Sequence, residues 1–417
     1  MKGSPGKILM FVENVYPGDT RVRNESELLT EAGYAITVVA MRGKGQRAAE
    51  VVNGVQVYRI PRLELFKKTP AQNPTRLQRF FTVTKSFVGY FSEYVYFTGT
   101  CFVMSLYVAL KHGFDVIHSH NPPDTLWLVA APYKLLGKKY VFDHHDLCPE
   151  LYRSRYGSAN GLVVGLLKWI EWGNLKLADV MIATNESYRE IEMRRGKRKA
   201  ERIFVVRNGP NRGRMGVPQP SERLRAMNKH ILCYVGALNP QDGLDYLLRS
   251  LRHLAFNMKR RDFYCVVMGS GDSLDDLRVL ARDLDLNGLV ELTGYVSDED
   301  LLANLAAADL CLDPDPSSPL NDVSTWIKIM EYMAFGKPIV AYDLKETRFS
   351  AQGAAVYVEP NNEAKFAEAI AALLDEPARR AKMGQLGRTR VESELQWSVV
   401  GKNLLAAYDT LLSKKLS

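Results

Sequence analysis

The chain has 417 residues, of which 46% are hydrophobic and 24% charged, and its formal net charge is +8 at pH 7. A single hydrophobic core rarely grows beyond about 300 residues, so the length predicts two domains or three small ones. The composition excludes a disordered or fibrous chain. Five cysteines stand singly, with no Cys-x-x-Cys pair, which predicts reduced core thiols in a cytosolic protein. Glu13 interrupts the first apolar run, so we expect no secretory signal.

Short apolar runs alternate with helical patterns through the amino-terminal half. A helix is predicted over 23–32. Buried strands are predicted at the segments 7–14, 35–41, 54–60, 114–120, 139–145, 179–184 and 202–208. Continuous apolar strands separated by helices predict a parallel sheet that is covered on both faces.

Residues 59–111 combine a basic segment with a long aromatic run. Arg76, Arg79 and Lys85 lead into the run 87–110, which exceeds the ~20 residues that a bilayer core requires. Glu93 and several polar residues inside the run argue against a membrane span. Besides a span, the run is interpreted either as a core helix or as a helix on an anionic membrane surface. On the surface interpretation, 59–111 contacts the cytoplasmic face of the membrane.

A second alternation follows a loop rich in Gly, Pro, Asn and Arg, the predicted linker near 208–222. Strands are predicted at the segments 230–238, 263–271, 290–296, 309–315, 337–343 and 354–360, with helices between them. The predicted fold class is α/β, with two Rossmann-like halves and a final helix that returns to the first half. The predicted domains are residues 1–208, 209–391 and, for the returning helix, 392–417. The carboxyl ends of the strands form a crevice in such sheets, so we expect the active site between the two halves.

The segment 326–343 places two opposite charges near the start of a predicted helix. Lys328 and Glu331 lie three residues apart, and Gly336 ends the helix before Pro338. A carboxylate can accept hydrogen bonds from ribose hydroxyls, and an ammonium with free helix N–H groups can face a pyrophosphate. The alternative is a surface ion pair between Lys328 and Glu331.

Several motifs along the whole chain resemble those of one enzyme family. They are Glu-x-Met-Ala-x-Gly-Lys-Pro-Ile-Val at 331–340, Gly-Ser-Gly-Asp at 269–272, TGYVSDEDLLANLAAADL, HSHNPPD and DHHD. Together they resemble the retaining glycosyltransferases of family 4, which have the GT-B fold, and within that family the bacterial branch that builds lipopolysaccharide and other surface polysaccharides. The resemblance implies a metal-independent transfer from a nucleoside-diphosphate sugar, expected to be a UDP-sugar, without a cofactor.

Residue by residue, the resemblance makes Glu331 the ribose ligand. Lys328 is predicted to be the catalytic cation because of its place near the helix start. Donor-binding positions that it also implies are Gly236, Gly269, Gly271 and the backbone of Val296. Val323 stands where the family usually has a second glutamate. We therefore expect the loop around it to read the donor sugar through Asn321, Asp322, Ser324 and Thr325.

Two cations that relatives use for the pyrophosphate are also replaced, here by Ala237 and Asp242. A buried pyrophosphate needs compensating charge or hydrogen bonds. Lys328 is the first candidate to take over this role, together with backbone N–H groups near Gly236 and at the start of the Trp326 helix.

Polar residues close two predicted strands of the amino-terminal half. The resemblance makes His120 and His145 catalytic or donor-sugar residues, and places His118 and Asp146 near the acceptor. A metal site is the alternative, since His118, His120, His144, His145, Asp143 and Asp146 offer suitable ligand atoms. We expect no metal, because alternate side chains of a strand face opposite sides. An acid–base pair of a hydrolase is a second alternative.

The loop NVYPGDTRVRNE supplies Gly18 and Arg21. In relatives this loop closes over the substrates, and Arg21 or Arg23 is expected to meet a lipid-linked diphosphate. The alternative is a plain helix start that is capped by Asp19 or Thr20.

The predicted function is transfer of a sugar to a lipid-linked or glycan acceptor by a peripheral enzyme at the cytoplasmic membrane face. A GT-B sugar-nucleotide epimerase and a non-catalytic nucleotide-binding protein are the alternatives. The basic run 189–202 is interpreted as a solvated helix end, and the sequence offers no module for base readout, so we expect no nucleic-acid partner.

Overall fold

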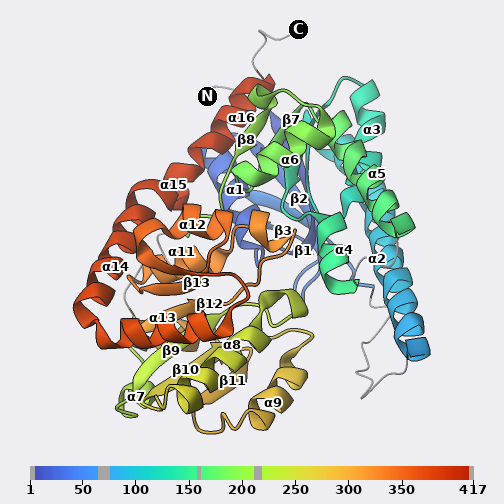
Figure 1. The fold of residues 1–417 in the computed structure, drawn as a ribbon. Helices are drawn as coiled ribbons and strands as arrows, with labels where there is room; N and C mark the ends of the chain where they lie inside the picture. Colours follow the sequence, from blue (N-terminus) through green and yellow to red (C-terminus); the bar gives the residue numbers. More distant parts are fainter. Residues whose placement is uncertain (1–4, 64–75, 157–160, 211–217, 413–417) are drawn as a thin grey trace. The chain divides into compact units, whose positions relative to one another are not determined.

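The computed structural model describes residues 5–63, 76–156, 161–210 and 218–412, with the backbone alone at most positions of 76–90 and at 156. The chain divides into an amino-terminal unit, Met1–Val206 with Gly401–Ser417, and a carboxy-terminal unit, Arg207–Val400. Both are α/β units (Figure 1). The side chains of Arg76, Arg79 and Lys85 lie outside the described residues.

The amino-terminal unit is built on an eight-stranded sheet of order β3-β4-β2-β1-β5-β6-β7-β8. All neighbouring strands are parallel except the pair β3 and β4. The strands are β1 (Lys7–Val15), β2 (Ala35–Met41), β3 (Ala49–Val52), β4 (Val55–Ile60), β5 (Val116–His120), β6 (Lys139–His144), β7 (Val180–Ala183) and β8 (Ile203–Val205). The sequence pattern did not predict β3, a short half-exposed edge strand.

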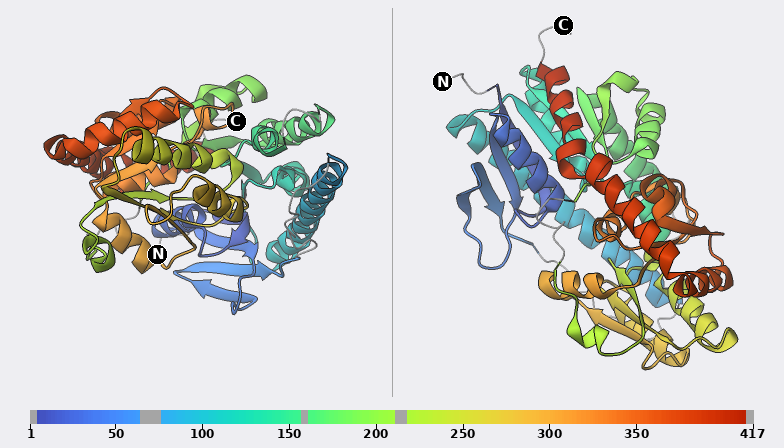
Figure 2. Two further views of the ribbon diagram at one scale, coloured as in Figure 1. Left: turned by 60° about the horizontal axis from the view of Figure 1, so that its bottom comes forward. Right: turned by 90° about the vertical axis from the view of Figure 1, so that its left-hand side faces the viewer.

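Helices surround this sheet. They are α1 (Thr20–Glu31), α2 (Arg76–Lys111), α3 (Trp127–Leu135), α4 (Cys148–Tyr156), α5 (Gly161–Leu177), α6 (Glu186–Gly196) and α16 (Lys402–Leu412). Figure 2 shows α16, in red, beside the strands of this unit. The Asn403 amide donates to the Val205 carbonyl at 2.8 Å, which fixes α16 to β8.

The carboxy-terminal unit is built on a six-stranded parallel sheet of order β11-β10-β9-β12-β13-β14. Its strands are β9 (His230–Val235), β10 (Phe263–Met268), β11 (Val290–Gly294), β12 (Leu310–Asp313), β13 (Ile339–Tyr342) and β14 (Ala355–Val358). Its helices are α7 (Glu222–Arg225), α8 (Leu244–Arg252), α9 (Leu274–Asp283), α10 (Asp298–Ala307), α11 (Ile327–Ala334), α12 (Lys345–Ala351), α13 (Glu363–Asp375), α14 (Pro377–Arg390) and α15 (Trp397–Val400). Residues of β9 alternate between two apolar clusters, so both faces of the sheet are covered.

The two parallel sheets confirm the predicted fold class. The return to the amino-terminal unit begins at Gly401, however, and not at 392. The reason is packing: Val391 and Leu395 are buried in the carboxy-terminal core, which keeps this segment in its own unit.

Candidate functional site

A buried charged cluster lies at the carboxyl ends of β5 and β6. The Arg21 guanidinium donates two hydrogen bonds to Asp143, at 2.8 Å from Nε and 2.7 Å from Nη2, and a third to the Val206 carbonyl at 2.8 Å. Its Nε also lies 3.2 Å from Glu25 Oε1. Both partners of the Arg21–Asp143 pair are buried and out of contact with bulk water. The charge of each is therefore stabilised mainly by the other.

The arrangement of Arg21 differs from the expectation of an arginine that faces a lipid-linked diphosphate. Asp19 caps α1 by accepting a hydrogen bond from the Val22 N–H at 3.0 Å, as the alternative interpretation held. This cap starts the helix at Thr20 and turns Arg21 toward Asp143. Gly18 belongs to the tight loop before the cap, where an added Cβ would lie 3.1 Å from the Val15 carbonyl oxygen.

The carboxyl groups of this cluster differ in charge. Burial opposes the charge of Asp143, but the Arg21 guanidinium and His145 hold its pKa well below the usual range. Burial raises the pKa of Glu25 well above the usual range, and the neighbouring Asp143 adds to this effect. The surroundings therefore favour the charged form of Asp143 and the neutral form of Glu25.

Three histidines lie around Asp143. The rings of His118 and His120 stack with centroids 4.3 Å apart, and burial lowers the pKa of both. His120 Nδ1 lies 3.1 Å from Asp143 Oδ2 and 3.2 Å from His145 Nε2. The structure thus brings together His118, His120 and His145, and keeps the first two neutral near pH 7.

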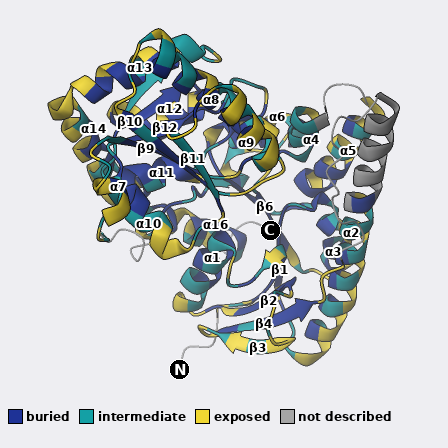
Figure 3. Cartoon of the chain, turned by 90° about the horizontal axis from the view of Figure 1, so that it is seen from below, coloured by how far each residue is buried: buried dark blue, intermediate teal, exposed yellow. Residues whose placement is uncertain are grey.

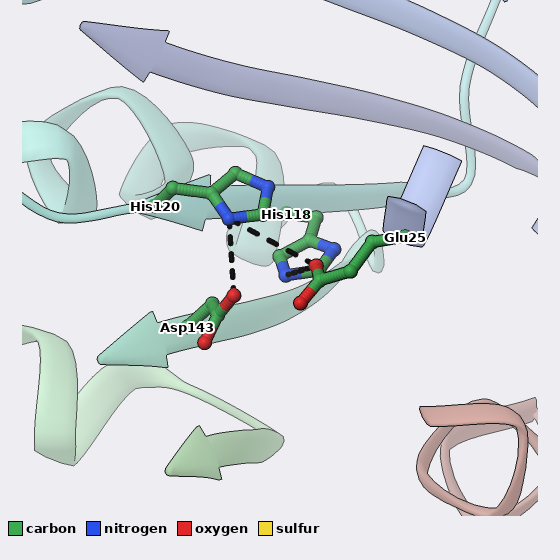
Figure 4. Close-up of side chains that lie close together, drawn as sticks. All are labelled: Glu25, His118, His120 and Asp143. Atoms are coloured by element: carbon green, nitrogen blue, oxygen red, sulfur yellow. Dashed lines mark hydrogen bonds and ion pairs between the residues drawn. The ribbon is translucent and has the colours of Figure 1, made fainter. Parts of the chain in front are cut away.

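The His118–His120 pair corrects the spacing argument against a metal. Residues two apart on a strand share a face, so His118 and His120 point the same way, toward Glu25 and Asp143 (Figure 4). The ligand atoms of these four side chains lie within 4.8 Å of one another, and zinc takes such ligands. The Arg21 guanidinium, however, already supplies a positive charge to both carboxyl groups. The absence of a metal stays a prediction.

Asn121 holds the loop that carries His145 and Asp146. Its Oδ1 accepts hydrogen bonds from the N–H groups of His145, at 2.6 Å, and Asp146, at 3.3 Å. Its Nδ2 donates to the Asp146 carbonyl at 2.7 Å and to Asp124 at 2.8 Å. The Asp146 side chain is exposed, while the His145 ring is half-buried.

His144, the next residue of β6 after Asp143, faces the opposite side of the strand. Its Nδ1 lies 3.2 Å from Glu192, and its Nε2 lies 3.7 Å from Glu171. Burial opposes its charge, but the hydrogen bond with Glu192 and the charges of Glu192 and Glu171 together raise the pKa of His144 to about 9. His144 is therefore a charged structural residue on the other face of the sheet.

Glycines shape the loops that follow β9 and β10 in the carboxy-terminal unit. An added Cβ at Gly269 would lie 1.8 Å from the Gly236 carbonyl oxygen, and one at Gly271 would lie 2.4 Å from that of Leu238. The two loops also share a hydrogen bond from the Leu238 N–H to the Ser270 carbonyl, at 3.2 Å. Close packing between the loops therefore requires these glycines, whichever ligand the loops bind.

Lys328 lies in a second buried charged cluster, at the end of β12. Its Nζ is 3.0 Å from Asp313 Oδ1 and forms a shorter contact with Asp315. It also lies 4.8 Å from the centroid of the Tyr234 ring. Burial works against its charge, but Asp315, Tyr234 and Asp313 together more than offset this, and the pKa of Lys328 lies well above the usual range. Burial raises the pKa of Asp315 as well.

This arrangement differs from the interpretation of Lys328 and Glu331 as a surface ion pair, while their role in donor binding stays a prediction. Lys328 is buried and pairs with two carboxyl groups from the β12 end, and Glu331 is half-buried one turn later on α11. The charge of the Lys328 ammonium is therefore already balanced by Asp313 and Asp315, and a ligand must compete with these two carboxyl groups for it. Val296 packs against the carboxy-terminal core.

Comparison with known families accounts for most of the chain. Residues 18–209 match the family described as "Glycosyl transferase 4-like domain", and residues 229–376 match "Glycosyl transferases group 1". The chain belongs to the glycosyltransferases of the GT-B fold.

Individual glycosyltransferases resemble the chain over different lengths. The GDP-mannose-dependent monoacylated alpha-(1-6)-phosphatidylinositol monomannoside mannosyltransferase of Corynebacterium glutamicum is 33% identical over 172 residues, which are 40% of this chain and 44% of that relative. The match thus spans less than half of the relative's length. Sucrose-phosphate synthase from Thermosynechococcus elongatus has a TM-score of 0.69 at 20% identity, with 97% of this chain and 98% of that one covered. HepE from Anabaena, in complex with UDP-glucose, has a TM-score of 0.70 at 14% identity, with 97% and 100% covered. These two likenesses show the fold.

In this glycosyltransferase the loop 321–325 was expected to bind the donor sugar. Several of its polar side chains instead form hydrogen bonds within the protein. Asn321 is buried and its Nδ2 donates to the carbonyls of Gln241 and Pro316, both at 2.9 Å. The Ser324 hydroxyl donates to the Leu320 carbonyl at 2.8 Å, and Asp322 accepts from Ser317 at 3.2 Å. Thr325 donates to Glu346 at 3.3 Å. These four residues therefore shape the loop, and their role as sugar ligands stays a prediction.

The sequence analysis missed most partners of the two cations. Asp143 was considered only as a metal ligand, and Glu25, Asp313 and Asp315 were not singled out. One signal was available: Asp143 and Asp313 both close apolar strands, where parallel sheets place polar groups at the same edge.

Proposed function

We propose that the chain transfers a sugar from a nucleoside-diphosphate sugar, with UDP as the preferred nucleotide, to a lipid-linked or glycan acceptor with retention of configuration. The observation that carries the proposal is the pair of glycine-lined loops after β9 and β10 in a unit that also presents Glu331 on α11. Such loops let backbone approach a nucleotide, and Glu331 would accept hydrogen bonds from the ribose hydroxyls.

The relatives support parts of this proposal. The Corynebacterium glutamicum relative is named for GDP-mannose as donor and for a phosphatidylinositol-based acceptor, and HepE is described with UDP-glucose. Both are nucleoside-diphosphate sugars, and the first acceptor is a lipid. A lipid-linked acceptor would place the enzyme at the cytoplasmic face of the membrane, in lipopolysaccharide or related polysaccharide synthesis.

In the proposed reaction the bond between C1 of the donor sugar and the β-phosphate oxygen breaks. The acceptor oxygen bonds to C1 on the same face, and its proton passes to the departing phosphate. Negative charge grows on this leaving group, so the site must offer positive charge or N–H donors. We assign this role to Lys328 and to the backbone N–H groups at the start of α11. The reaction then needs no metal ion.

The contacts of Lys328 add one condition to the proposal. Its ammonium must partly leave a carboxyl group to serve the leaving phosphate. Asp315 suits this step because burial already raises its pKa and so favours its neutral form, which holds the ammonium less tightly than a carboxylate does. In the amino-terminal unit, His120 and His145 are assigned to the sugar next to the reacting carbon, and Gly18, His118 and Asp146 to the acceptor side.

A thermal-shift screen of UDP- and GDP-sugars tests the donor class, since only a bound ligand raises the melting temperature by mass action. Calorimetry with UDP and GDP then compares the wild type with Glu331→Ala. Loss of a charged hydrogen-bond acceptor is expected to weaken binding at least about tenfold. Glu368→Ala, on the exposed face of α13, is the matched control. Unchanged affinity in Glu331→Ala would remove its role, and no stabilisation by any nucleotide sugar would reject the donor class.

Steady-state kinetics test Lys328 separately. Lys328→Met is expected to lower kcat much more than it changes KM, because the cation serves charge that develops only in the transition state. Asp315→Asn should keep most of the activity, since it leaves the ammonium in place. Equal effects of Lys328→Met on donor affinity and on turnover would reduce Lys328 to a binding residue.

A further inference from the structure

The helices α2, α3 and α5 expose an unusual amount of apolar surface. The described residues expose 22 large apolar side chains, of which seven lie on α2, two on α3, one directly after α3 and four on α5. Helix α3 contacts both of the others, so the three helices form one part of the amino-terminal unit (Figure 3). We call the following residues the three-helix surface: Phe91, Val95, Phe102, Val103, Leu106, Tyr107, Leu110, Leu128, Leu135, Leu136, Leu162, Leu166, Trp169 and Trp172.

Helix α2 has two apolar stripes. Phe97, Cys101 and Val108 are buried and hold the helix against its unit. The second stripe passes through Val95 and Leu106 and ends at Leu110, which is 91% exposed. The segment Phe91–Lys111 is long and apolar enough to cross a membrane, but one of its sides packs on protein. A helix in this position can lie along a bilayer surface without crossing the bilayer.

The apolar stripe continues on α5, in a segment that the sequence analysis did not connect with membranes. Leu162 is 88% exposed, and Trp169 and Trp172 follow it toward the helix end. Lys176 lies over the Trp172 ring, 6.0 Å from its centroid. Tryptophan rings with neighbouring lysines are typical of the membrane–water interface, where the ring lies at headgroup depth and the amine reaches phosphate.

The charges around this surface favour an anionic partner. Lys111, Lys168 and Lys176 are exposed. The acidic residues in the described side chains of the three helices are Glu93, which is half-buried, and Glu171, which is buried and paired with Arg195. A second copy of the same surface would bring lysines against lysines, whereas an anionic leaflet neutralises them.

We infer that the three-helix surface docks on an anionic bilayer leaflet, with Leu and Trp side chains of α5 and α3 immersed together with those of α2. The inference deepens the proposed function, since it names the face that would meet the membrane in which a lipid-linked acceptor resides. It also extends the predicted contact beyond 59–111, to residues 127–136 and 162–176.

Sedimentation with vesicles of equal parts phosphatidylglycerol and phosphatidylcholine tests the inference. The decisive variant changes only α5, with Leu162→Glu and Trp169→Glu together, because these side chains are 88% and 57% exposed. Its vesicle partition is expected to fall at least about tenfold, given the free energy of burying two large apolar side chains. Val279→Glu with Leu386→Glu is the control, since both residues are exposed apolar side chains of the carboxy-terminal unit, at 45% and 48%.

Three results would overturn the inference. They are equal partition of the α5 variant and the wild type, equal binding of the wild type to vesicles of phosphatidylcholine alone, and a wild-type dimer in light scattering that the α5 variant converts to a monomer. Circular dichroism confirms that the variants are folded. Calorimetry with UDP and GDP on the wild type and the variants separates the two proposals. A wild type that binds neither nucleotide would reject the proposed function. A variant that loses vesicle binding but still binds nucleotide leaves the proposed function intact.

Discussion

Each unit holds a buried cation between two carboxyl groups at the end of a parallel sheet, but the two cations differ. Arg21 uses its planar fork on Asp143 and a further donor on the Val206 carbonyl, so its position is fixed by several directed bonds. Lys328 is a point charge between Asp313 and Asp315, beside the Tyr234 ring. A flexible ammonium can exchange one carboxyl group for a ligand, whereas a bidentate guanidinium cannot do so without losing its geometry. The comparison assigns a scaffold role to the first cluster and a ligand-responsive role to the second.

Removal of Arg21 should have the largest effect on stability. Arg21→Met leaves Asp143 as a buried carboxylate without its cation, and we expect a loss of about 3–5 kcal/mol in the free energy of unfolding. Hydrogen exchange of the slowest amides in β1 and β5 measures this loss for the amino-terminal unit. Lys138→Met, which removes an exposed pair with Asp115, is the control and should cost about 0.5 kcal/mol or less. A similar, small cost for both variants would end the scaffold interpretation.

Lys328→Met should destabilise the carboxy-terminal unit by a smaller amount, about 2–3 kcal/mol. The effect is smaller because Asp315, the pKa of which burial already raises, can become neutral when the ammonium is gone. Addition of Asp315→Asn should recover roughly half of the loss, since it removes one of the two acids. Amide exchange in β9 and β12 measures the stability of the single and of the double variant. If the double variant is no more stable than Lys328→Met, Lys328 stabilises the unit through packing alone.

His144 provides a pH-dependent contrast to the neutral histidines beside Arg21. Its pKa is raised from 6.5 to about 9, so its stabilising contribution is fully present below about pH 6.5 and is lost as the pH rises through 9. The contribution is about 3 kcal/mol at most. Urea unfolding of the wild type and of His144→Gln should therefore differ most near pH 6 and converge above pH 9. A difference that is constant with pH would contradict a charged His144.

The smallest effect is expected at the contact between α16 and the Arg21 cluster. The Tyr408 hydroxyl lies 3.0 Å from His118 Nδ1, and both groups are buried. Tyr408→Phe should cost about 1 kcal/mol, the ordinary worth of one buried hydrogen bond. Thermal unfolding measures it, and Tyr357→Phe, which removes a hydroxyl bonded to the Gln352 carbonyl at 2.8 Å on an exposed part of the carboxy-terminal unit, is the control. A larger loss in the control would show that Tyr408 does not anchor α16.

The fold followed from local patterns, while the charged clusters did not. Continuous apolar strands such as Lys139–His144 predict a parallel sheet whatever their partners, because hydrogen-bonded strands with two apolar faces need helices on both sides. The pairing of Arg21 with Asp143 joins residues 122 positions apart, and no spacing rule predicts it. The cap at Asp19 is a local signal that was visible, and it decided where Arg21 points.

The sequence by itself determined the two α/β units, the glycine-bearing loops after β9 and β10, and the carboxylate on α11, since periodicity and turn chemistry are properties of neighbouring residues. Only the tertiary structure decided that Arg21 and Lys328 are neutralised by buried acids and that α3 and α5 extend the apolar face of α2. Charge neutralisation and surface exposure depend on which distant segments the fold brings into contact. Local sequence patterns do not predict such long-range contacts.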